Sequence, residues 1–335
     1  MLYDCFCFFN ELDLLEIRLN ELDNVVDKFV LVEAELTHNG DAKPLYFERN
    51  KSRFAKFLDK IIHVVVHKED YAQAMVGQTF QERAWMRENI QRNAIRKGTK
   101  DAQDDDLIMV SDLDEIPRAT AVAKVKDAIK DGEVVGLVLN AYSFYANLRN
   151  ASAPYWGNDP KIATARTFKA EKAYESSPYN HFILRAVNTC PTATRFRYIK
   201  PSRRIENAGW HFSYIGGIDA AVIKVKASNE VGLYGRKDLH KHVEKCITSG
   251  KALFGGDRFL PEIVDDSYPR FLLDNLGRFV HLFVPCPENR RVMLRCLFVW
   301  HKHMGICRRF AMRILFWMTP KWVRTIIKKL LGYDF

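Results

Sequence analysis

Apolar runs alternate with amphipathic stretches over roughly the first 140 residues of the chain. Five apolar runs have the length of buried strands, at residues 2–9, 28–33, 60–66, 106–111 and 133–139. Three stretches with apolar residues three or four positions apart predict helices, at 11–22 after an Asn10 N-cap, at 79–97 before Gly98, and at 119–130. This alternation predicts an α/β fold with a Rossmann-like, mostly parallel sheet and helices on both faces. Ligands bind such sheets beyond the carboxyl ends of the strands.

The pattern changes after residue 145. Residues 1–145 are expected to form a nucleotide-binding half, because they carry the alternating strands and helices. Residues 146–288 are irregular and rich in aromatic, His and Gly residues, which suits a half that binds a second substrate. A third segment, 289–335, differs from both in its charge.

That last segment is a basic tail. Residues 289–335 contain eleven Lys and Arg residues and one acid, Asp334, and so carry the whole formal charge of +10. Tryptophans and phenylalanines alternate with the basic residues, and Pro320 divides two expected amphipathic helices. Such helices are suited to the surface of an anionic membrane, although a terminal helix packed on the domain would have the same periodicity. The rest of the chain is formally neutral, which argues against a general nucleic-acid-binding surface.

The amino-acid composition limits the class of protein and the cellular compartment that can be expected. With 47% hydrophobic residues the chain is neither disordered nor collagenous, and its seven cysteines form no C-x-x-C pair. No run reaches the roughly 18 apolar residues of a membrane span, and the apolar N-terminus lacks the features of a signal peptide. We therefore expect a cytoplasmic protein in a reducing compartment, peripheral to the inner face of a membrane.

The sharpest chemical feature follows the fourth predicted strand. Alternation along an extended backbone would place Asp112 and Asp114 on one side, where two carboxylates can hold a divalent cation that binds a diphosphate. Such an ion neutralises the charge of a departing diphosphate. The alternative is a solvated acidic turn before the next helix. Asp104–Asp106, at the opposite end of the strand, are expected to form a solvated loop.

Several segments in series resemble glycosyltransferase family 17, the family of β-1,4-mannosyl-glycoprotein β-1,4-N-acetylglucosaminyltransferases. The matching segments run in family order over roughly residues 1–285: CFCFFNELDLLEIRLNEL (5–22), DKFVLVE (27–33), PLYF (44–47), QRNAI (91–95), DDLIMVSDLDEIP (105–117) and GWHFSYIGG (209–217).

The resemblance implies a GT-A fold, a nucleotide-sugar donor such as UDP-GlcNAc, Mn²⁺ or Mg²⁺, and transfer with inversion. It makes Asp112 and Asp114 the site for the metal and the diphosphate, supported by Glu115. The remaining donor contacts that it implies are Phe9, Asn10, Glu11, Arg92 and Asn93. Residues 1–145 then become the nucleotide-sugar-binding half and 146–288 the acceptor-binding half.

Inverting transfer also needs a carboxylate base near the acceptor hydroxyl. Glu230 is the first candidate, because its place after a glycine-rich loop at 216–217 resembles the arrangement in GT-A enzymes, where such a loop precedes an acidic base. Asp219 and Asp257 come next. For acceptor binding we expect a stacking role for Trp210 and a polar contact from His211. His240 and His242 are weaker candidates for a third metal ligand.

Together these features predict a metal-dependent inverting glycosyltransferase that extends a glycan or a lipid-linked saccharide at a membrane surface. Two other functions stay open. A nucleotidyl- or phosphosugar transferase would use the same metal site, but the sequence after the first strand lacks a glycine-rich phosphate loop with Lys or Arg. A non-catalytic glycan- or membrane-binding protein could also retain this scaffold.

Overall fold

A computed structural model describes residues 1–75, 79–170, 193–229 and 231–284. The predicted tail of amphipathic helices (289–335) and the candidate base Glu230 lie outside these residues. Within them, the strands form two sheets of seven and five strands. None of the described helices is both long and apolar enough to cross a membrane.

The larger sheet is mostly parallel, as predicted. In the described part of the chain its order is β10-β6-β9-β4-β1-β2-β3, and only β9 runs antiparallel to its neighbours β4 and β6. Its strands are β1 (Leu2–Phe8), β2 (Lys28–Ala34), β3 (Ile61–Val66), β4 (Leu107–Asp112), β6 (Val135–Leu137), β9 (Lys161–Thr164) and β10 (Arg203–Ile205). The predicted α/β class is therefore confirmed.

The smaller sheet was not predicted. Its order is β12-β8-β7-β11-β5, and its strands are β5 (Glu115–Pro117), β7 (Asn140–Ser143), β8 (Leu148–Asn150), β11 (Gly209–Ser213) and β12 (Phe259–Pro261). Both sheets take strands from each side of residue 145, so the expected boundary does not separate them. The assignment of donor and acceptor binding to the two halves stays a prediction.

The main helices lie where periodicity placed them, with corrected ends. They are α1 (Leu12–Leu22), α3 (Phe80–Asn93), α4 (Ile95–Gly98) and α5 (Ala119–Ala128). Asn10 is not the N-cap of α1, because Glu11 takes that position and its side chain makes no capping bond. Thr79 and Glu82 form a capping box that starts α3, and Ala94 separates α3 from α4.

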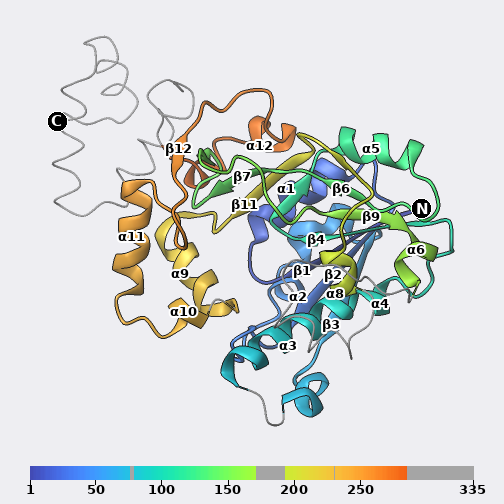
Figure 1. Cartoon of the computed structure of the whole chain (residues 1–335), viewed down its shortest axis with the longest axis horizontal. Helices are drawn as coiled ribbons and strands as arrows, with labels where there is room; N and C mark the ends of the chain where they lie inside the picture. Colours follow the sequence, from blue (N-terminus) through green and yellow to red (C-terminus); the bar gives the residue numbers. More distant parts are fainter. Residues whose placement is uncertain (76–78, 171–192, 230, 285–335) are drawn as a thin grey trace.

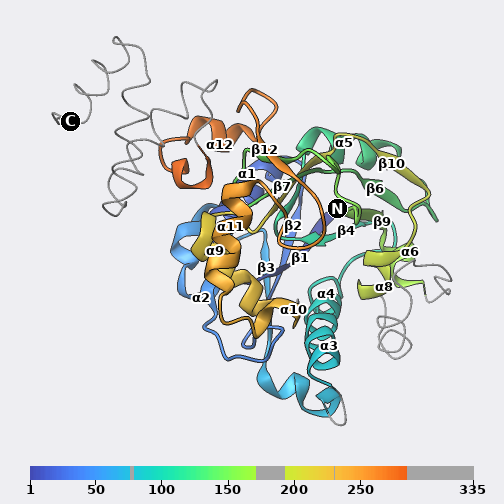
Figure 2. The same ribbon diagram turned by 60° about the vertical axis from the view of Figure 1, so that its left-hand side comes forward.

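Shorter helices complete the described part of the chain. They are α2 (Tyr46–Arg49), α6 (Ala165–Lys169), α8 (Ala193–Tyr198), α9 (Gly217–Ala227), α10 (Val231–Tyr234), α11 (Leu239–Ser249) and α12 (Arg270–Asp274), with 3₁₀ turns η1 (Lys51–Phe57), η2 (Lys68–Met75) and η3 (Val280–Leu282). Helices α9, α10 and α11 lie together beside the sheets (Figures 1 and 2).

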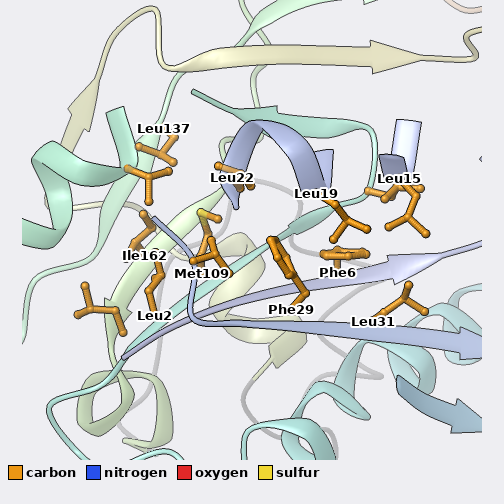
Figure 3. Close-up of a cluster of buried hydrophobic side chains, with 14 of the residues drawn as sticks. Leu2, Phe6, Leu15, Leu19, Leu22, Phe29, Leu31, Met109, Leu137 and Ile162 are labelled. Atoms are coloured by element: carbon orange, nitrogen blue, oxygen red, sulfur yellow. The ribbon is translucent and has the colours of Figure 1, made fainter. Parts of the chain in front are cut away.

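The larger sheet has a hydrophobic core on each face, because side chains alternate along its strands. Phe6 and Phe29 pack under Leu15, Leu19 and Leu22 of α1 on one face (Figure 3). On the other face, a second cluster joins strands β1 to β4 to α4, α6 and α8. The opposite side of α1 is also covered, by a third cluster that includes Trp210 and Phe212 of β11. Helix α1 is therefore buried nearly all round rather than along one stripe.

The chain order creates a switch point between β1 and β4. After β1 the chain passes through α1 to β2 and then β3, and it returns through α3 and α4 to β4 on the other side of β1. At such a point the connections leave in opposite directions, and ligands bind in the crevice beyond the carboxyl ends of the strands. Cys7 and Asp112, near the ends of β1 and β4, are paired in register there.

Candidate active site

A cavity of about 480 Å³ opens at this switch point. One part is lined by residues that follow β1 and β4 and by α3, including Phe9, Arg92 and Asp112. The other part is lined by the smaller sheet and the loop before β12, including Trp156 and Asp257. The cavity therefore takes its lining from the carboxyl ends of the larger sheet and from the smaller sheet with its adjoining loops.

The carboxylates of the D-x-D motif both line the cavity, but not for the reason inferred from the sequence. Strand β4 ends at Asp112, and residues 113–114 form a turn rather than extended backbone. Leu113 is buried between the two aspartates. The Asp112 side chain is 38% exposed, whereas that of Asp114 is 7% exposed. The turn therefore presents one open and one buried carboxylate.

Arg18 of α1 fixes the shape of that turn. Its Nη1 donates to the backbone carbonyls of Asp112 at 3.0 Å and Leu113 at 3.3 Å, and to that of Glu115 at 2.7 Å. Its other nitrogens bind the Asp4 carboxylate and the Ser111 hydroxyl. Because the guanidinium is fully buried, the turn is held from the core side by a group with fixed geometry.

Asp112 is paired with two arginines. Arg92 Nη1 donates to Asp112 Oδ1 at 2.7 Å, and Arg197 Nη2 lies 3.7 Å from Oδ2. Burial alone would raise the pKa of Asp112, but the two guanidinium groups outweigh it and hold the pKa well below its usual range. Arg92 also donates to Glu88 at 2.8 Å. Asp112 is therefore ionised, and Arg92, a predicted donor contact, lies in the cavity wall beside it.

Asp114 is paired with a lysine that the sequence did not single out. Lys224 Nζ, from α9, lies 2.5 Å from Asp114 Oδ2 and 3.2 Å from Glu11 Oε1. Burial lowers the pKa of Lys224, but Asp114 and Glu11 outweigh it and raise the pKa above its usual value. His211 Nε2 lies 3.7 Å from Asp114 Oδ1, and burial lowers the pKa of His211 to about 4. Near neutral pH the site thus holds a charged lysine and a neutral imidazole.

Glu115 supports the turn from behind the cavity. It is fully buried, and its Oε2 accepts from the Asp112 backbone N–H at 2.9 Å. Its Oε1 accepts from Trp156 Nε1 at 2.6 Å and from Arg197. Burial is the main reason that the pKa of Glu115 rises, to about 7. Glu115 does not line the cavity; it links the D-x-D turn to Trp156.

The expected stacking role of Trp210 is wrong. Trp210 is 1% exposed and packs in the core cluster between α1 and β11, stacked against Phe212. The tryptophan in the cavity wall is Trp156, whose ring lies 4.1 Å from the ring of His211 between centroids. His211 does line the cavity, as expected for a substrate contact.

The remaining predicted residues divide between the cavity and other places. Phe9 and Glu11 line it, whereas Asn10 does not. Asn93 faces α8, where its Oδ1 accepts from the Thr194 backbone N–H at 3.1 Å. Both of these donor contacts are therefore corrected.

Among the candidate bases, only one is found in the cavity wall of the described chain. Asp257 lines the cavity, and its Oδ2 accepts from Asn150 Nδ2 at 2.8 Å. Asp219 is 89% exposed on α9 and pairs with His240 at 3.3 Å, away from the cavity. His242 is also outside, near the thiol of Cys246. These positions rule against Asp219 as the base and against His240 and His242 as metal ligands.

Sequence reasoning missed several cavity residues because nothing local marks them. Lys224 lies in an ordinary helical pattern (AAVIKVKA), and Trp156 lies in an irregular stretch between β8 and β9.

Outside the cavity, Asp106 also differs from the prediction. It was expected in a solvated loop, but it is buried and binds the N-terminal amine at 2.5 Å. Only the fold brings these groups to their partners.

Comparison with known proteins points to one family. The model of glycosyltransferase family 17 matches residues 1–185, more than half of the chain. The β-1,4-mannosyl-glycoprotein 4-β-N-acetylglucosaminyltransferases of Homo sapiens and Mus musculus are 27% and 26% identical over 119 residues. These residues make up 35% of this chain and 22% of each relative, so the match spans about a fifth of the relatives' length.

Two solved structures also match part of the chain, at lower sequence identity. The galactosyltransferase LgtC, in complex with donor and acceptor sugar analogues, is 11% identical with a TM-score of 0.31, over 58% of this chain and 68% of its own. A 4-diphosphocytidyl-2C-methyl-D-erythritol synthase is 13% identical with a TM-score of 0.31, over 62% of this chain and 88% of its own.

Proposed function

The chain belongs to glycosyltransferase family 17, and we propose that it transfers N-acetylglucosamine from UDP-GlcNAc, with inversion, to a hydroxyl of a glycan or lipid-linked saccharide. The observation that carries this proposal is the pair Asp112 and Asp114 in a cavity at the β1/β4 switch point. The name of the human relative supports N-acetylglucosamine as the sugar.

The donor set of the turn fits a divalent cation such as Mn²⁺ or Mg²⁺. Asp112 offers a partly exposed carboxylate, Asp114 a second one, and His211 a neutral nitrogen 3.7 Å from Asp114. Hard cations prefer carboxylate oxygens, and Mn²⁺ also accepts imidazole. When bound, the ion would supply positive charge that stabilises the departing diphosphate.

Side chains of the protein orient Asp112, remove the proton of the acceptor hydroxyl and contact the acceptor sugar. Arg92 and Arg197 fix the orientation of Asp112 and keep it ionised. Asp257, held by Asn150, is the general base in the acceptor part of the cavity. It takes the proton of the acceptor hydroxyl while that oxygen bonds to the anomeric carbon and the bond from this carbon to the diphosphate oxygen breaks. Trp156 offers a ring face on which a sugar can stack.

Thermal stabilisation by nucleotide sugars tests this function. UDP-GlcNAc should raise the melting temperature of the wild type only with Mn²⁺, and GDP-, CMP- and dTDP-sugars should not. Asp112→Asn and Asp114→Asn should abolish the shift, whereas Asp219→Asn, an exposed aspartate outside the cavity, should keep it. A shift that survives both cavity variants would exclude the metal assignment, and no shift with any donor would favour a non-catalytic binding protein.

Membrane contact through residues 289–335 is part of the proposal, and the charge of +10 in this segment supports it. A peripheral enzyme at the inner face of the membrane would extend a lipid-linked or surface saccharide. The full chain should sediment with vesicles that contain anionic lipid and be released by salt, and Lys328→Glu/Lys329→Glu should weaken this binding. Equal sedimentation with neutral vesicles would contradict an electrostatic role for the tail, and binding to oligonucleotides alone would indicate a nucleic-acid partner.

A further inference from the structure

Lys224 lies where the second carboxylate of the D-x-D turn would hold a metal ion. Its ammonium group bridges Asp114 Oδ2 at 2.5 Å and Glu11 Oε1 at 3.2 Å. These carboxylates come from different elements, the turn after β4 and the residue before α1. An ammonium between two carboxylates supplies part of the positive charge that a bound divalent cation would supply there.

The position of Lys224 is fixed by the end of its helix. His38 donates from its backbone N–H to the carbonyl of Ala227 at 3.0 Å, and Asn39 Nδ2 donates to the carbonyls of Lys226 and Ser228, each at 2.6 Å. Asn229 Nδ2 donates to Glu88 at 2.5 Å. The last turn of α9 is thus tied to the loop after β2 and to α3. The side chain of Lys224 is 24% exposed, and it lines the cavity.

The two halves of the D-x-D turn therefore differ in how their charge is balanced. Asp112 is paired with Arg92, which also binds Glu88 and is 3% exposed, so this pair is built into the wall. Asp114 depends on a flexible lysine side chain that can leave without moving the backbone. A divalent ion that binds Asp114 through Oδ2 must displace Lys224, while Arg92 can remain on Asp112 Oδ1.

We infer that Lys224 is a built-in competitor for the metal: it occupies Asp114 when no donor is bound, weakens metal binding to the donor-free protein, and is freed toward the donor's phosphates when the ion enters. This inference rests on the proposed function, because it concerns the same donor site. It makes binding of the metal and of the nucleotide sugar mutually dependent. The released ammonium becomes available to a diphosphate only after the ion has taken its place.

Manganese binding to the full-length, donor-free protein tests the inference without any activity assay. Lys224→Met removes the competing charge and keeps a long apolar side chain, so it should bind Mn²⁺ at least about tenfold more tightly than the wild type by titration calorimetry, or about 1.4 kcal/mol. Lys224→Gln should do the same if the methionine variant folds poorly. Lys224→Arg should stay near the wild type.

A matched control lies two residues further along the same helix. Lys226 is exposed and does not line the cavity, so Lys226→Met should leave Mn²⁺ affinity unchanged. The gain in Lys224→Met should disappear when Asp114→Asn is added, since the ion then loses the carboxylate that was freed. Mn²⁺ affinities of Lys224→Met and Lys224→Gln that both rise by less than about tenfold over the wild type, or that fall, would overturn the inference.

The outcomes also separate this inference from the proposed function. If no nucleotide sugar stabilises the wild type but Lys224→Met gains Mn²⁺ affinity at Asp114, the competition holds and the donor assignment fails. If UDP-GlcNAc binds with Mn²⁺ but the Lys224 variants bind Mn²⁺ like the wild type, the competition fails alone.

Discussion

Arg18 Nη1 donates to the backbone carbonyl of Glu115 at 2.7 Å, across 97 positions of sequence. The same guanidinium binds Asp4 in the first strand, and neither side chain is exposed. One buried arginine therefore connects β1, α1 and the turn that carries Asp112 and Asp114. The shape of the candidate metal site depends on a residue that never touches the cavity.

Replacing Arg18 should cost much of the stability of the fold. Arg18→Met leaves Asp4 buried without a partner, and breaking a buried pair in this way costs about 3–5 kcal/mol. Urea unfolding should report this loss. The double variant Arg18→Met/Asp4→Leu should recover a large part of it, because no charge then stays unpaired. A single variant within about 1 kcal/mol of the wild type would contradict the role of this pair.

The sequence predicted those elements whose burial produces a regular pattern of apolar residues. The four strands β1 to β4 and helix α1 were placed within one or two residues, because a strand buried on both faces reads as a continuous apolar run. Periodicity did not predict that both sides of α1 are buried. The second side packs on β11 and α12, and this contact arises only when the smaller sheet forms.

The candidate site was predicted less completely. The D-x-D aspartates were found because they directly follow a predicted buried strand, a local signal. Trp210 was expected to stack on a sugar because it lies in a matching segment flanked by glycines, yet β11 turns it into the core, and no local signal singled out Trp156. Lys224 could not be found, since its significance depends on Asp114 and Glu11, which are more than 100 positions away. Local pattern identifies strand ends, whereas partners across the fold need the structure.

Close packing at Gly98 gives a test of the hydrophobic cluster that joins β1 to β4 with α4, α6 and α8. A Cβ at this position would lie 2.3 Å from Val30 Cγ1 and 3.2 Å from Val64 Cγ2. Gly98→Ala should therefore destabilise the protein by about 1–3 kcal/mol through overpacking. Gly157→Ala is the matched control, because a Cβ there meets nothing within 4 Å. If thermal unfolding gives equal melting temperatures for the two variants, α4 is not packed on β2 and β3 as described.

Asp13 should make stability depend on acid pH. Burial alone would raise its pKa, but hydrogen bonds from His281 at 2.8 Å and Arg53 at 2.5 Å outweigh burial and lower the pKa from 3.8 to about 2. A carboxylate whose pKa is lower in the folded state than in the unfolded state stabilises the protein at pH values above its unfolded-state pKa. This contribution is lost as the pH falls through the folded-state pKa. The stabilisation is therefore complete above about pH 4 and gone near pH 2.

Urea unfolding of the wild type and Asp13→Asn at a series of pH values measures this contribution. The difference in unfolding free energy should be largest at pH 5 and shrink steadily below pH 4. Asp105→Asn, whose side chain is 96% exposed, should show little difference at any of these values. A difference in unfolding free energy between the wild type and Asp13→Asn that stays constant down to pH 2 would mean that the ion pairs of Asp13 do not form in solution.

The two tryptophans should separate substrate binding from stability. Trp156→Ala removes a ring from the acceptor part of the cavity, and the loss of one stacking contact should raise the acceptor KM about tenfold, with a smaller loss of stability than that of Trp210→Ala. Trp210→Ala instead removes a ring that is 1% exposed, so it should cost about 3–5 kcal/mol of stability. A glycan array with labelled UDP-GlcNAc would identify the acceptor for the kinetic comparison.

Because Trp156 also donates to Glu115, the variant Trp156→Phe tests that hydrogen bond. Phenylalanine keeps a ring but loses the donor, so an acceptor KM near that of the wild type would assign the effect to stacking. A tenfold rise in KM for Trp156→Phe as well would assign it to the Glu115 contact that holds the D-x-D turn.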